Sequence, residues 1–405
     1  MRILWVSDAP WASSGYSVQT RLAAPRLAAL GHDVALVAAY GLQGAAMAWE
    51  GLKVYPGGAD PFGNDAIPRA AADWQADVVI TLKDAGVYNP QTFQGLRWCP
   101  LTPVDHEPIP PAVHQRVAAC YRPIAYAPNG LRAMREIGYD PLYCPHAYDP
   151  AVFSPVPRDE ARRALGLADD LFIVATVAVN RGAEISRKAW QQNLEAFAMF
   201  AADKPHARYL LHTDMADDGY EGGFPLRAIA QGLGIVDKVI PSEQGRYRAG
   251  GFDEPYLRAL YCAANVVNCV SVGEGFGIPT LEAQACGTPV ITGGWAASED
   301  LNFGGWEVER GDALKLFDRQ LSHVYLPLPD AVAGCLRDAY AALSSPRVAA
   351  MHRREALHGA QDYQIDTVVE DYWRPALDAL AAQIAGEHRR GVVRIVRPEE
   401  VLSYA

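Results

Sequence analysis

Two glutamates flank a glycine-containing loop in the second half of the chain, Glu274-Gly275-Phe276-Gly277-Ile278-Pro279-Thr280-Leu281-Glu282. A predicted strand over 265–270 leads into the loop, Pro279 lies where a helix is expected to begin, and Gly287 lies just beyond its end. A glycine-rich turn before a helix N-terminus exposes N–H groups and the positive end of the helix dipole, which favour phosphate. Because each carboxylate can accept hydrogen bonds from two neighbouring hydroxyls, the spacing suits a sugar on one side and a ribose on the other.

A second segment offers cations for the same phosphate. The loop Asn180-Arg181-Gly182-Ala183-Glu184-Ile185-Ser186-Arg187-Lys188 follows a predicted strand over 172–179. Arginine provides a fork for two phosphate oxygens, and lysine provides a movable point charge. Cations are unfavourable at a helix N-terminus unless an anion is present, which favours Arg187 and Lys188 as diphosphate ligands over a solvated helix start. Arg181 remains a rival to Arg187.

Further polar residues follow other predicted strands. Ligands bind beyond the carboxyl ends of strands in open α/β sheets, so these residues are expected to face a ligand. We assign Gly15 and His212 to the donor. We assign four others to acceptor binding, although Asp105 and His106 could also bind donor hydroxyls: Asp8, Tyr16, Asp105 and His106. Each of these residues could instead be purely structural.

Neither a metal nor an additional cofactor is expected. The sequence lacks an Asp-x-Asp bridge at a strand end, and Asp214, Asp217 and Asp218 do not form a convincing site. Seven scattered cysteines without a C-x-x-C pair are typical of thiols in a reducing cytoplasm.

The elements that must position these residues alternate between apolar strands and helices, which predicts helix-covered parallel sheets. Expected strands cover 3–6, 33–38, 77–82, 101–104, 124–127, 172–179, 209–211, 265–270 and 289–292. Expected helices cover 17–30, kinked at Pro25, then 188–200, 254–262 and 367–385. A proline-rich connector over 144–157 divides the chain. We therefore predict an N-terminal Rossmann-like domain over 1–150 and a second over 151–365. A C-terminal helix packing back on the first domain, with a basic tail, covers 366–405.

Composition sets further bounds. The chain has 405 residues and a formal charge of -11, so a basic footprint over the whole surface for nucleic acid is absent. The first strand turns polar at Ser7-Asp8, too soon for a signal peptide, and no apolar run reaches the ~20 residues of a membrane span. We expect a cytoplasmic protein without a membrane span, and its oligomeric state stays open.

The block from Glu274 through Ala283-Gln284-Ala285-Cys286-Gly287-Thr288-Pro289-Val290-Ile291 resembles the E-x7-E signature of retaining GT-B glycosyltransferases of the family 4-like group. The linker Pro145-His146-Ala147-Tyr148-Asp149 also resembles that family. The resemblance implies two Rossmann-like domains facing across a cleft and a nucleotide-diphosphate sugar as donor, with UDP favoured over GDP. It implies catalytic roles for Glu274, Arg187 and Lys188. It implies donor binding by Glu282, Gly275, Phe276, Gly277, Ile278, Asn180 and Arg181.

The expected reaction is metal-independent transfer of a hexose with retention, in which a phosphate oxygen takes the acceptor proton. The acceptor is predicted to be a saccharide or a small-molecule alcohol. A hydroxymethylated DNA base is the alternative, because the segment from Asp8 to Arg21 resembles phage-type glycosyltransferases. The loop 245–248 and a basic tail with Arg389, Arg390, Arg394 and Arg397 could touch phosphate. A nucleotide-sugar epimerase and a non-catalytic nucleotide-sugar binder are alternatives of other classes.

Overall fold

A computed structural model describes residues 1–182, 186–216 and 223–390, with side chains as far as Glu387. The chain divides into two compact units. Unit 1 contains Met1–Ala147, Arg319–Ser322 and the segment from Ile365 onward, and unit 2 contains Tyr148–Asp318 and His323–Gln364. Unit 1 is therefore built from separate stretches of the sequence.

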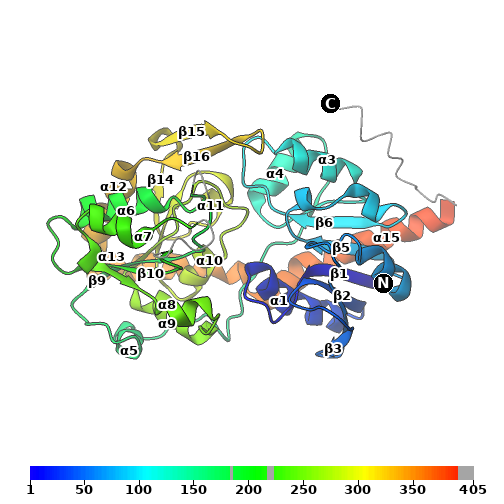
Figure 1. Cartoon of the computed structure of the whole chain (residues 1–405), viewed down its shortest axis with the longest axis horizontal. Helices are drawn as coiled ribbons and strands as arrows, with labels where there is room; N and C mark the ends of the chain where they lie inside the picture. The colour runs from blue at the N-terminus through cyan, green and yellow to red at the C-terminus, as the bar shows by residue number, and fades with distance from the viewer. Residues whose placement is uncertain (183–185, 217–222, 391–405) are drawn as a thin grey trace. The chain divides into compact units, whose positions relative to one another are not determined.

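Unit 1 is organised around an eight-stranded sheet within the described chain, in the order β3-β4-β2-β1-β5-β6-β7-β8 (Figure 1). All neighbours are parallel except the β3-β4 pair, which is antiparallel. The strands are β1 Arg2–Asp8, β2 Asp33–Tyr40, β3 Met47–Trp49, β4 Leu52–Pro56, β5 Val78–Leu82, β6 Trp98–Thr102, β7 Ile124–Ala125 and β8 Leu142–Tyr143. Without β3, this is the doubly wound strand order: successive strands are added on one side of β1 up to β4 and then on its other side from β5 onward, so the switch point lies between β1 and β5.

The helices of unit 1 bury the apolar strands, whose side chains are buried along nearly their whole length. They are α1 Gly15–Ala29, α2 Ile67–Trp74, α3 Pro111–Ala119, α4 Pro128–Glu136, α14 Ile365–Val368 and α15 Arg374–Arg390. Helix α1 begins at an N-cap, Ser14, whose hydroxyl accepts a 3.1 Å hydrogen bond from the Ser17 amide, and it runs on through Pro25. A π-helical turn, Val369–Trp373, precedes α15. It places the ring centroid of Trp373 5.5 Å from that of Trp5 in β1.

Unit 2 has a six-stranded parallel sheet within the described residues, in the order β11-β10-β9-β12-β13-β14. Its strands are β9 Phe172–Val177, β10 Ala207–His212, β11 Val239–Pro241, β12 Val266–Asn268, β13 Val290–Gly293 and β14 Trp306–Val308. Numbered within the unit, this is the Rossmann order 3-2-1-4-5-6, with its switch point between β9 and β12. An antiparallel hairpin, β15 Ala313–Phe317 and β16 His323–Pro327, extends from this part of the sequence.

The helices of unit 2 are α5 Arg158–Ala164, α6 Trp190–Ala201, α7 Leu226–Gly232, α8 Gln244–Arg248, α9 Glu254–Ala263, α10 Ile278–Ala285, α11 Ala296–Asp300, α12 Pro329–Leu343 and α13 Pro346–Ala360. The core of the unit gathers large side chains from α6 and β10. The ring centroids of Phe197 and Tyr209 lie 4.8 Å apart, and Trp190 is fully buried.

The expected α/β class with two Rossmann-like sheets is confirmed, while several boundaries differ. The strand expected over 101–104 begins at Trp98, because Trp98 and Cys99 are buried sheet residues despite the proline that follows them. The helix expected from position 188 begins at Trp190, because Ala189 adopts a left-handed conformation with φ 47°. The final helical stretch is divided by the π-turn. All seven cysteines are free thiols, and no helix of the described chain is both long and apolar enough to cross a membrane.

Candidate active site

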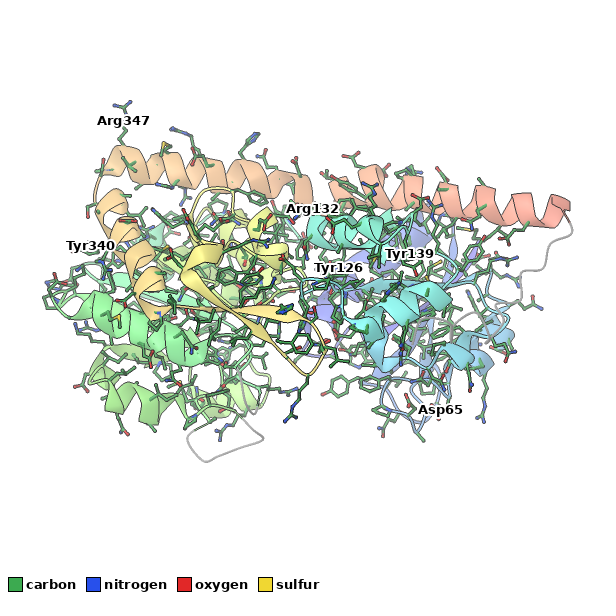
Figure 2. All side chains as sticks on the ribbon, turned by 90° about the horizontal axis from the view of Figure 1, so that it is seen from above. Asp65, Tyr126, Arg132, Tyr139, Tyr340 and Arg347 are labelled. Atoms are coloured by element: carbon green, nitrogen blue, oxygen red, sulfur yellow. The ribbon has the colours of Figure 1, made fainter. Side chains whose placement is uncertain are left out.

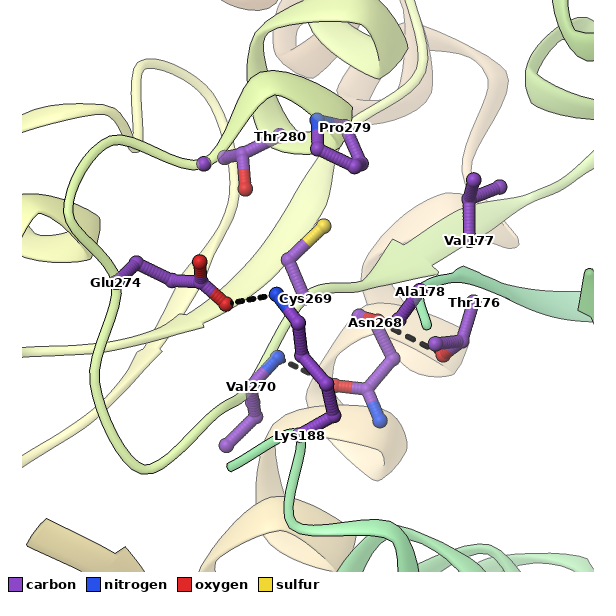
Figure 3. A pocket seen from close by; sticks show the side chains of 11 residues that line it. Thr176, Val177, Ala178, Lys188, Asn268, Cys269, Val270, Glu274, Pro279 and Thr280 are labelled. Atoms are coloured by element: carbon purple, nitrogen blue, oxygen red, sulfur yellow. Dashed lines mark hydrogen bonds and ion pairs between the residues drawn. The ribbon is translucent and has the colours of Figure 1, made fainter. Parts of the chain in front are cut away.

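A small pocket lies at the carboxyl ends of β9 and β12, at the switch point of the unit 2 sheet (Figure 3). Thr176, Val177 and Ala178 line it from the β9 side, and Asn268, Cys269 and Val270 line it from the β12 side. Gly277, Pro279 and Thr280 close it from the start of α10. The pocket therefore lies where doubly wound sheets bind their ligands.

The turn into α10 depends on Gly277. Gly277 caps the helix with φ 103°, a left-handed conformation that suits glycine, and a Cβ there would lie 3.2 Å from the Thr280 hydroxyl. Pro279 occupies the first turn of the helix. Gly275 and Phe276 are buried and Ile278 is half-buried, so the loop packs against the protein while the start of α10 lies at the pocket.

Glu274 pairs with both predicted cations. The Lys188 ammonium lies at hydrogen-bonding distance from Oε1, and Arg187 Nη1 lies 3.1 Å from Oε2. Burial alone would raise the pKa of Glu274, but the charges of Lys188 and Arg187 outweigh it and lower the pKa to about 2. Burial and the neighbouring Arg187 lower the pKa of Lys188, and Glu274 opposes them. The three side chains form a compact ionic cluster at the pocket.

The side chains of Lys188 and Arg187 differ in exposure. The Lys188 side chain is 15% exposed, so it does not lie at a solvated helix start, whereas the Arg187 side chain is 48% exposed. Cations at a helix N-terminus need a nearby anion, and Glu274 of the protein itself supplies it. A diphosphate would therefore compete with Glu274 for cations that are already paired.

A buried amide network holds the backbone of this cluster. The Asn193 side-chain amide donates 3.0 Å bonds to the carbonyls of Lys188 and Val270, so it joins the start of α6 to the end of β12. Asn268 donates to Asn193 at 3.0 Å and to the Tyr209 hydroxyl at 3.1 Å. Because these bonds are buried, they fix Lys188 relative to the pocket. Our sequence analysis missed Asn193, since nothing in a helical segment marks one asparagine as a bridge.

Glu282 lies one turn into α10 and is 7% exposed. The Tyr261 hydroxyl of α9 donates a 2.8 Å hydrogen bond to its Oε2. Burial raises the pKa of Glu282 to about 8, and the Tyr261 bond only partly offsets this effect. Unlike Glu274, this carboxyl forms no ion pair with any residue that the structure describes. The sequence did not identify Tyr261, because its role depends on how α9 packs on α10.

The other predicted donor residues lie on neighbouring strand ends. Asn180 is buried, and its amide donates to the Asp214 and Phe224 carbonyls and accepts from the Phe224 amide. Arg181 is exposed, while positions 183–185 of the same loop fall outside the described residues. His212 ends β10, and its Nδ1 lies 2.8 Å from the Ser242 hydroxyl; burial lowers its pKa to about 4. The donor roles of Asn180, Arg181 and His212 stay predictions.

Unit 1 brings Asp8 to the switch point between β1 and β5. Asp8 is buried, accepts a 2.6 Å bond from the Ser14 hydroxyl and forms an ion pair with Lys83, which follows β5. Tyr16 lies beside this pair, with its ring 5.0 Å from the Lys83 ammonium. Gly15 is the exposed first residue of α1. Our sequence analysis missed Lys83, although its position directly after a buried strand is the signal that selected Asp8.

Asp105 and His106 follow β6 in the same sheet. The His106 Nδ1 lies 2.6 Å from an Asp105 oxygen, and the His106 side chain is buried. Tyr16 donates a 3.1 Å bond to Asp84, the residue after Lys83. Both Asp84 and Asp105 contribute to raising the pKa of the buried Tyr126, after burial itself. The predicted acceptor residues Asp8, Tyr16, Asp105 and His106 thus lie at the carboxyl ends of neighbouring strands, and their binding role stays a prediction.

Two further expectations concern metal and phosphate. Within the described ranges, His, Cys, Asp and Glu residues form no group of three or more that could hold a metal ion. In the loop 245–248, Arg248 is engaged by Asp214 at 2.9 and 3.0 Å, and Arg246 donates to the Gly251 carbonyl at 2.5 Å. Arg394 and Arg397 of the basic tail lie outside the described residues, as do the side chains of Arg389 and Arg390.

Two Rossmann-like units, one of them with a pocket at the switch point of its sheet, define a class of α/β protein in which ligands bind beyond the carboxyl ends of the strands. The fold is that of the GT-B glycosyltransferases. Residues 227–323 match the sequence model of the family described as Glycosyl transferases group 1.

Individual glycosyltransferases and related proteins are similar to this chain in sequence or in fold. The D-inositol 3-phosphate glycosyltransferase of Mycolicibacterium paratuberculosis is 34% identical over 231 residues, which are 55% of this chain and 45% of that protein. The chain spans about half the length of the curated relatives that it matches. Sucrose-phosphate synthase from Thermosynechococcus elongatus superposes with a TM-score of 0.71 at 18% identity, over 94% of this chain and 99% of that one. Anabaena HepE in complex with UDP and glucose superposes with a TM-score of 0.66 at 15% identity, over 93% and 100%.

Proposed function

We propose that this protein is a retaining glycosyltransferase that moves a hexose from a nucleotide-diphosphate sugar to an acceptor hydroxyl. The observation that carries the proposal is the buried Glu274, held between Lys188 and Arg187 beside the N-terminus of α10. This cluster combines a carboxylate that can orient a sugar with cations that can bind a diphosphate. The match to group 1 glycosyltransferases and the relatives' names support the same reaction class.

In the proposed reaction, the diphosphate binds Arg187, Lys188 and the positive N-terminal end of α10. The acceptor hydroxyl attacks the anomeric carbon on the face that the diphosphate leaves, and a phosphate oxygen takes the hydroxyl proton. Catalysis then consists of positioning and of electrostatic stabilisation of the leaving group. Glu274 orients the donor sugar and Glu282 accepts hydrogen bonds from the ribose. The protein cations take the place of a metal.

UDP is the favoured nucleotide, in keeping with Anabaena HepE, a protein of the same fold whose structure is a complex with UDP and glucose. The acceptor is proposed to be a saccharide or a small-molecule alcohol, in keeping with relatives that are named for inositol 3-phosphate. Transfer onto a hydroxymethylated DNA base remains the second candidate.

A donor screen tests the proposal. Hydrolysis of UDP- and GDP-sugars is measured alone, with glycans, with polyols and with hydroxymethylated DNA, and the anomeric configuration of each product is determined. We expect turnover with a UDP-sugar and retention in the product. Glu274→Gln should lower kcat, whereas Glu299→Gln is a matched control, because Glu299 is more exposed and pairs with Arg310.

Other outcomes separate the rival classes. A new sugar nucleotide formed without any acceptor would assign the protein to the epimerases. Donor binding without turnover under every condition would identify a non-catalytic binder, and inversion in the product would overturn the proposed stereochemistry.

A further inference from the structure

The loop that leads to Glu274 is buried, and each of its carbonyls from Val270 to Glu274 accepts a hydrogen bond. A buried loop cannot leave its carbonyls to water, so their partners must come from the surrounding elements. The donors belong to separate segments of unit 2 and are, in the order of the carbonyls, the Asn193 side-chain amide at 3.0 Å, the Trp295 indole at 3.0 Å, the Tyr325 backbone amide at 3.2 Å, Arg187 Nη1 at 3.2 Å and the Ala297 backbone amide at 3.2 Å. The loop is therefore held along its whole length, and not only at the Glu274 side chain.

Trp295 has the largest side chain among these donors, and it is 1% exposed. Its indole ring lies against Gly293 at the end of β13, where a Cβ would be 2.3 Å from the ring carbon Cζ2. The ring also stacks on that of Tyr325, with the two centroids 5.6 Å apart. Tyr325 belongs to β16 of the hairpin, the two-stranded ribbon drawn in yellow in Figure 2. The indole therefore packs against both β13 and the hairpin, and these contacts direct its N–H to the Ser271 carbonyl.

Ala296, between Trp295 and Ala297, has a left-handed backbone with φ 50°. This conformation is unfavourable for a residue with a Cβ and persists where the surrounding structure imposes it. With this turn in the chain, the Trp295 side chain reaches the Ser271 carbonyl and the Ala297 N–H reaches the Glu274 carbonyl. Three consecutive residues after β13 therefore hold the loop at Ser271 and again at Glu274.

These bonds to the loop backbone become decisive when a donor is bound. In the ligand-free protein, Lys188 and Arg187 also hold the carboxylate of Glu274. A diphosphate competes for the same two cations, so the ion pairs weaken once it is in place. The bonds from Trp295 and Ala297 end on carbonyls of the loop, and a phosphate does not compete for them. The position of Glu274 during transfer therefore depends on these bonds.

We propose that Trp295 is a positioning residue for sugar transfer, which keeps Glu274 against the donor sugar after the diphosphate has taken over Lys188 and Arg187. The inference rests on the proposed function, because it concerns the contact between Glu274 and that sugar. Trp295 acts through Glu274 and does not itself touch the donor. A displacement of about 1 Å at a positioning group can cost ~100-fold in rate, so a single lost bond to the loop is a measurable change.

Trp295→Phe tests the proposal, because it removes the N–H donor and keeps an aromatic ring beside Gly293. We expect kcat for transfer from the UDP-sugar to fall at least ~10-fold. The Kd of UDP, measured by isothermal titration calorimetry, should change less than ~2-fold, because UDP lacks the sugar that Glu274 orients. A merely structural role would lower the Tm and leave the kcat of the folded enzyme unchanged.

Trp98→Phe is the matched control. Trp98 is also 1% exposed, and its indole donates a 2.9 Å bond to the Thr81 hydroxyl in unit 1. The control should lower the Tm by a comparable amount and keep the wild-type kcat. Tyr325→Leu is the second variant, because it removes the ring on which Trp295 stacks and keeps the indole N–H. It should lower kcat more than it changes the Kd of UDP, and it decides the question if Trp295→Phe does not fold.

A double-mutant cycle identifies the residue through which Trp295 acts. In the Glu274→Gln background, Trp295→Phe should lower kcat less than ~2-fold further, because the carboxylate that it positions is already gone. The inference is overturned if Trp295→Phe keeps the wild-type kcat, if the affinity for UDP falls in parallel with kcat, or if the two substitutions multiply in full. A wild type that turns over no nucleotide sugar would instead overturn the proposed function, and this inference with it.

Discussion

Glu282→Gln should remove a loss of folding stability that the ligand-free wild type undergoes as the pH rises. Burial raises the pKa of Glu282 to about 8 from an ordinary value of 4.5, so the folded protein keeps a proton that the unfolded chain loses. The stabilising effect of this proton is complete below pH ~4.5 and is lost as the pH rises through the folded pKa. Glutamine keeps the shape and can still accept the Tyr261 hydrogen bond, but it cannot ionise.

The size of the effect follows from the two pKa values. With ~1.4 kcal/mol for each pKa unit, the wild type should lose about 3 kcal/mol relative to the variant between pH 4 and pH 7. By pH 9 the relative loss should approach about 5 kcal/mol, an upper figure because local opening admits water. For a unit of this size, such a loss corresponds to a difference in Tm of roughly 10 °C.

Thermal unfolding of both proteins, followed by circular dichroism at several values between pH 4 and pH 9, gives the comparison. The wild-type Tm should fall relative to that of Glu282→Gln as the pH rises. Donor affinity should move the other way in the wild type, because ribose hydroxyls donate to the ionised carboxylate, and it should stay flat in the variant. Parallel Tm curves for the two proteins would refute the buried, protonated Glu282.

Three further predictions concern the groups that neutralise the diphosphate. Lys188→Ala should lower kcat at least ~10-fold and destabilise the fold by about 3–5 kcal/mol, because it leaves Glu274 charged, buried and short of a partner. Adding Glu274→Gln should recover stability in thermal melts but not the rate, and full stability of Lys188→Ala alone would contradict this reasoning. Arg181→Ala should cost less kcat than Arg187→Ala, and the reverse order in steady-state rates would assign the diphosphate to Arg181. Activity should survive EDTA, whereas complete loss that Mg²⁺ or Mn²⁺ restores would require a metal in the mechanism.

Local signals predicted the parts of the site that are close together in the sequence. The glycine loop, Pro279 and the two glutamates lie on one strand–loop–helix segment, so their relative placement follows from the order of residues. Buried apolar runs predicted most central strands, because strands covered on both faces have few polar residues. The regions 329–343 and 346–360 received no assignment, although Pro329 and Pro346 lie at the first turns of their helices and are a usable start signal.

Long-range pairs could not be predicted from one sequence. Glu274 meets Lys188 across 86 residues, and Tyr261 reaches Glu282 through the packing of two helices. The sequence predicted the residue types at the pocket but not that Lys188 is buried and already neutralised. Lys83 illustrates a different omission, because its strand-end position was visible in the sequence and only its pairing with Asp8 required the fold.

The discontinuity of unit 1 has a consequence for biosynthesis. Its first 147 residues leave the ribosome early, but the π-turn that packs Trp373 against Trp5 is made only after all of Tyr148–Gln364. While unit 2 is translated and folds, the first 147 residues of unit 1 therefore lack the π-turn and α15, and the surface that these elements cover stays exposed. Only the short segment Arg319–Ser322 of unit 1 is made during this time. Translation speed through the second half of the message thus sets how long that apolar surface is available to chaperones or to aggregation.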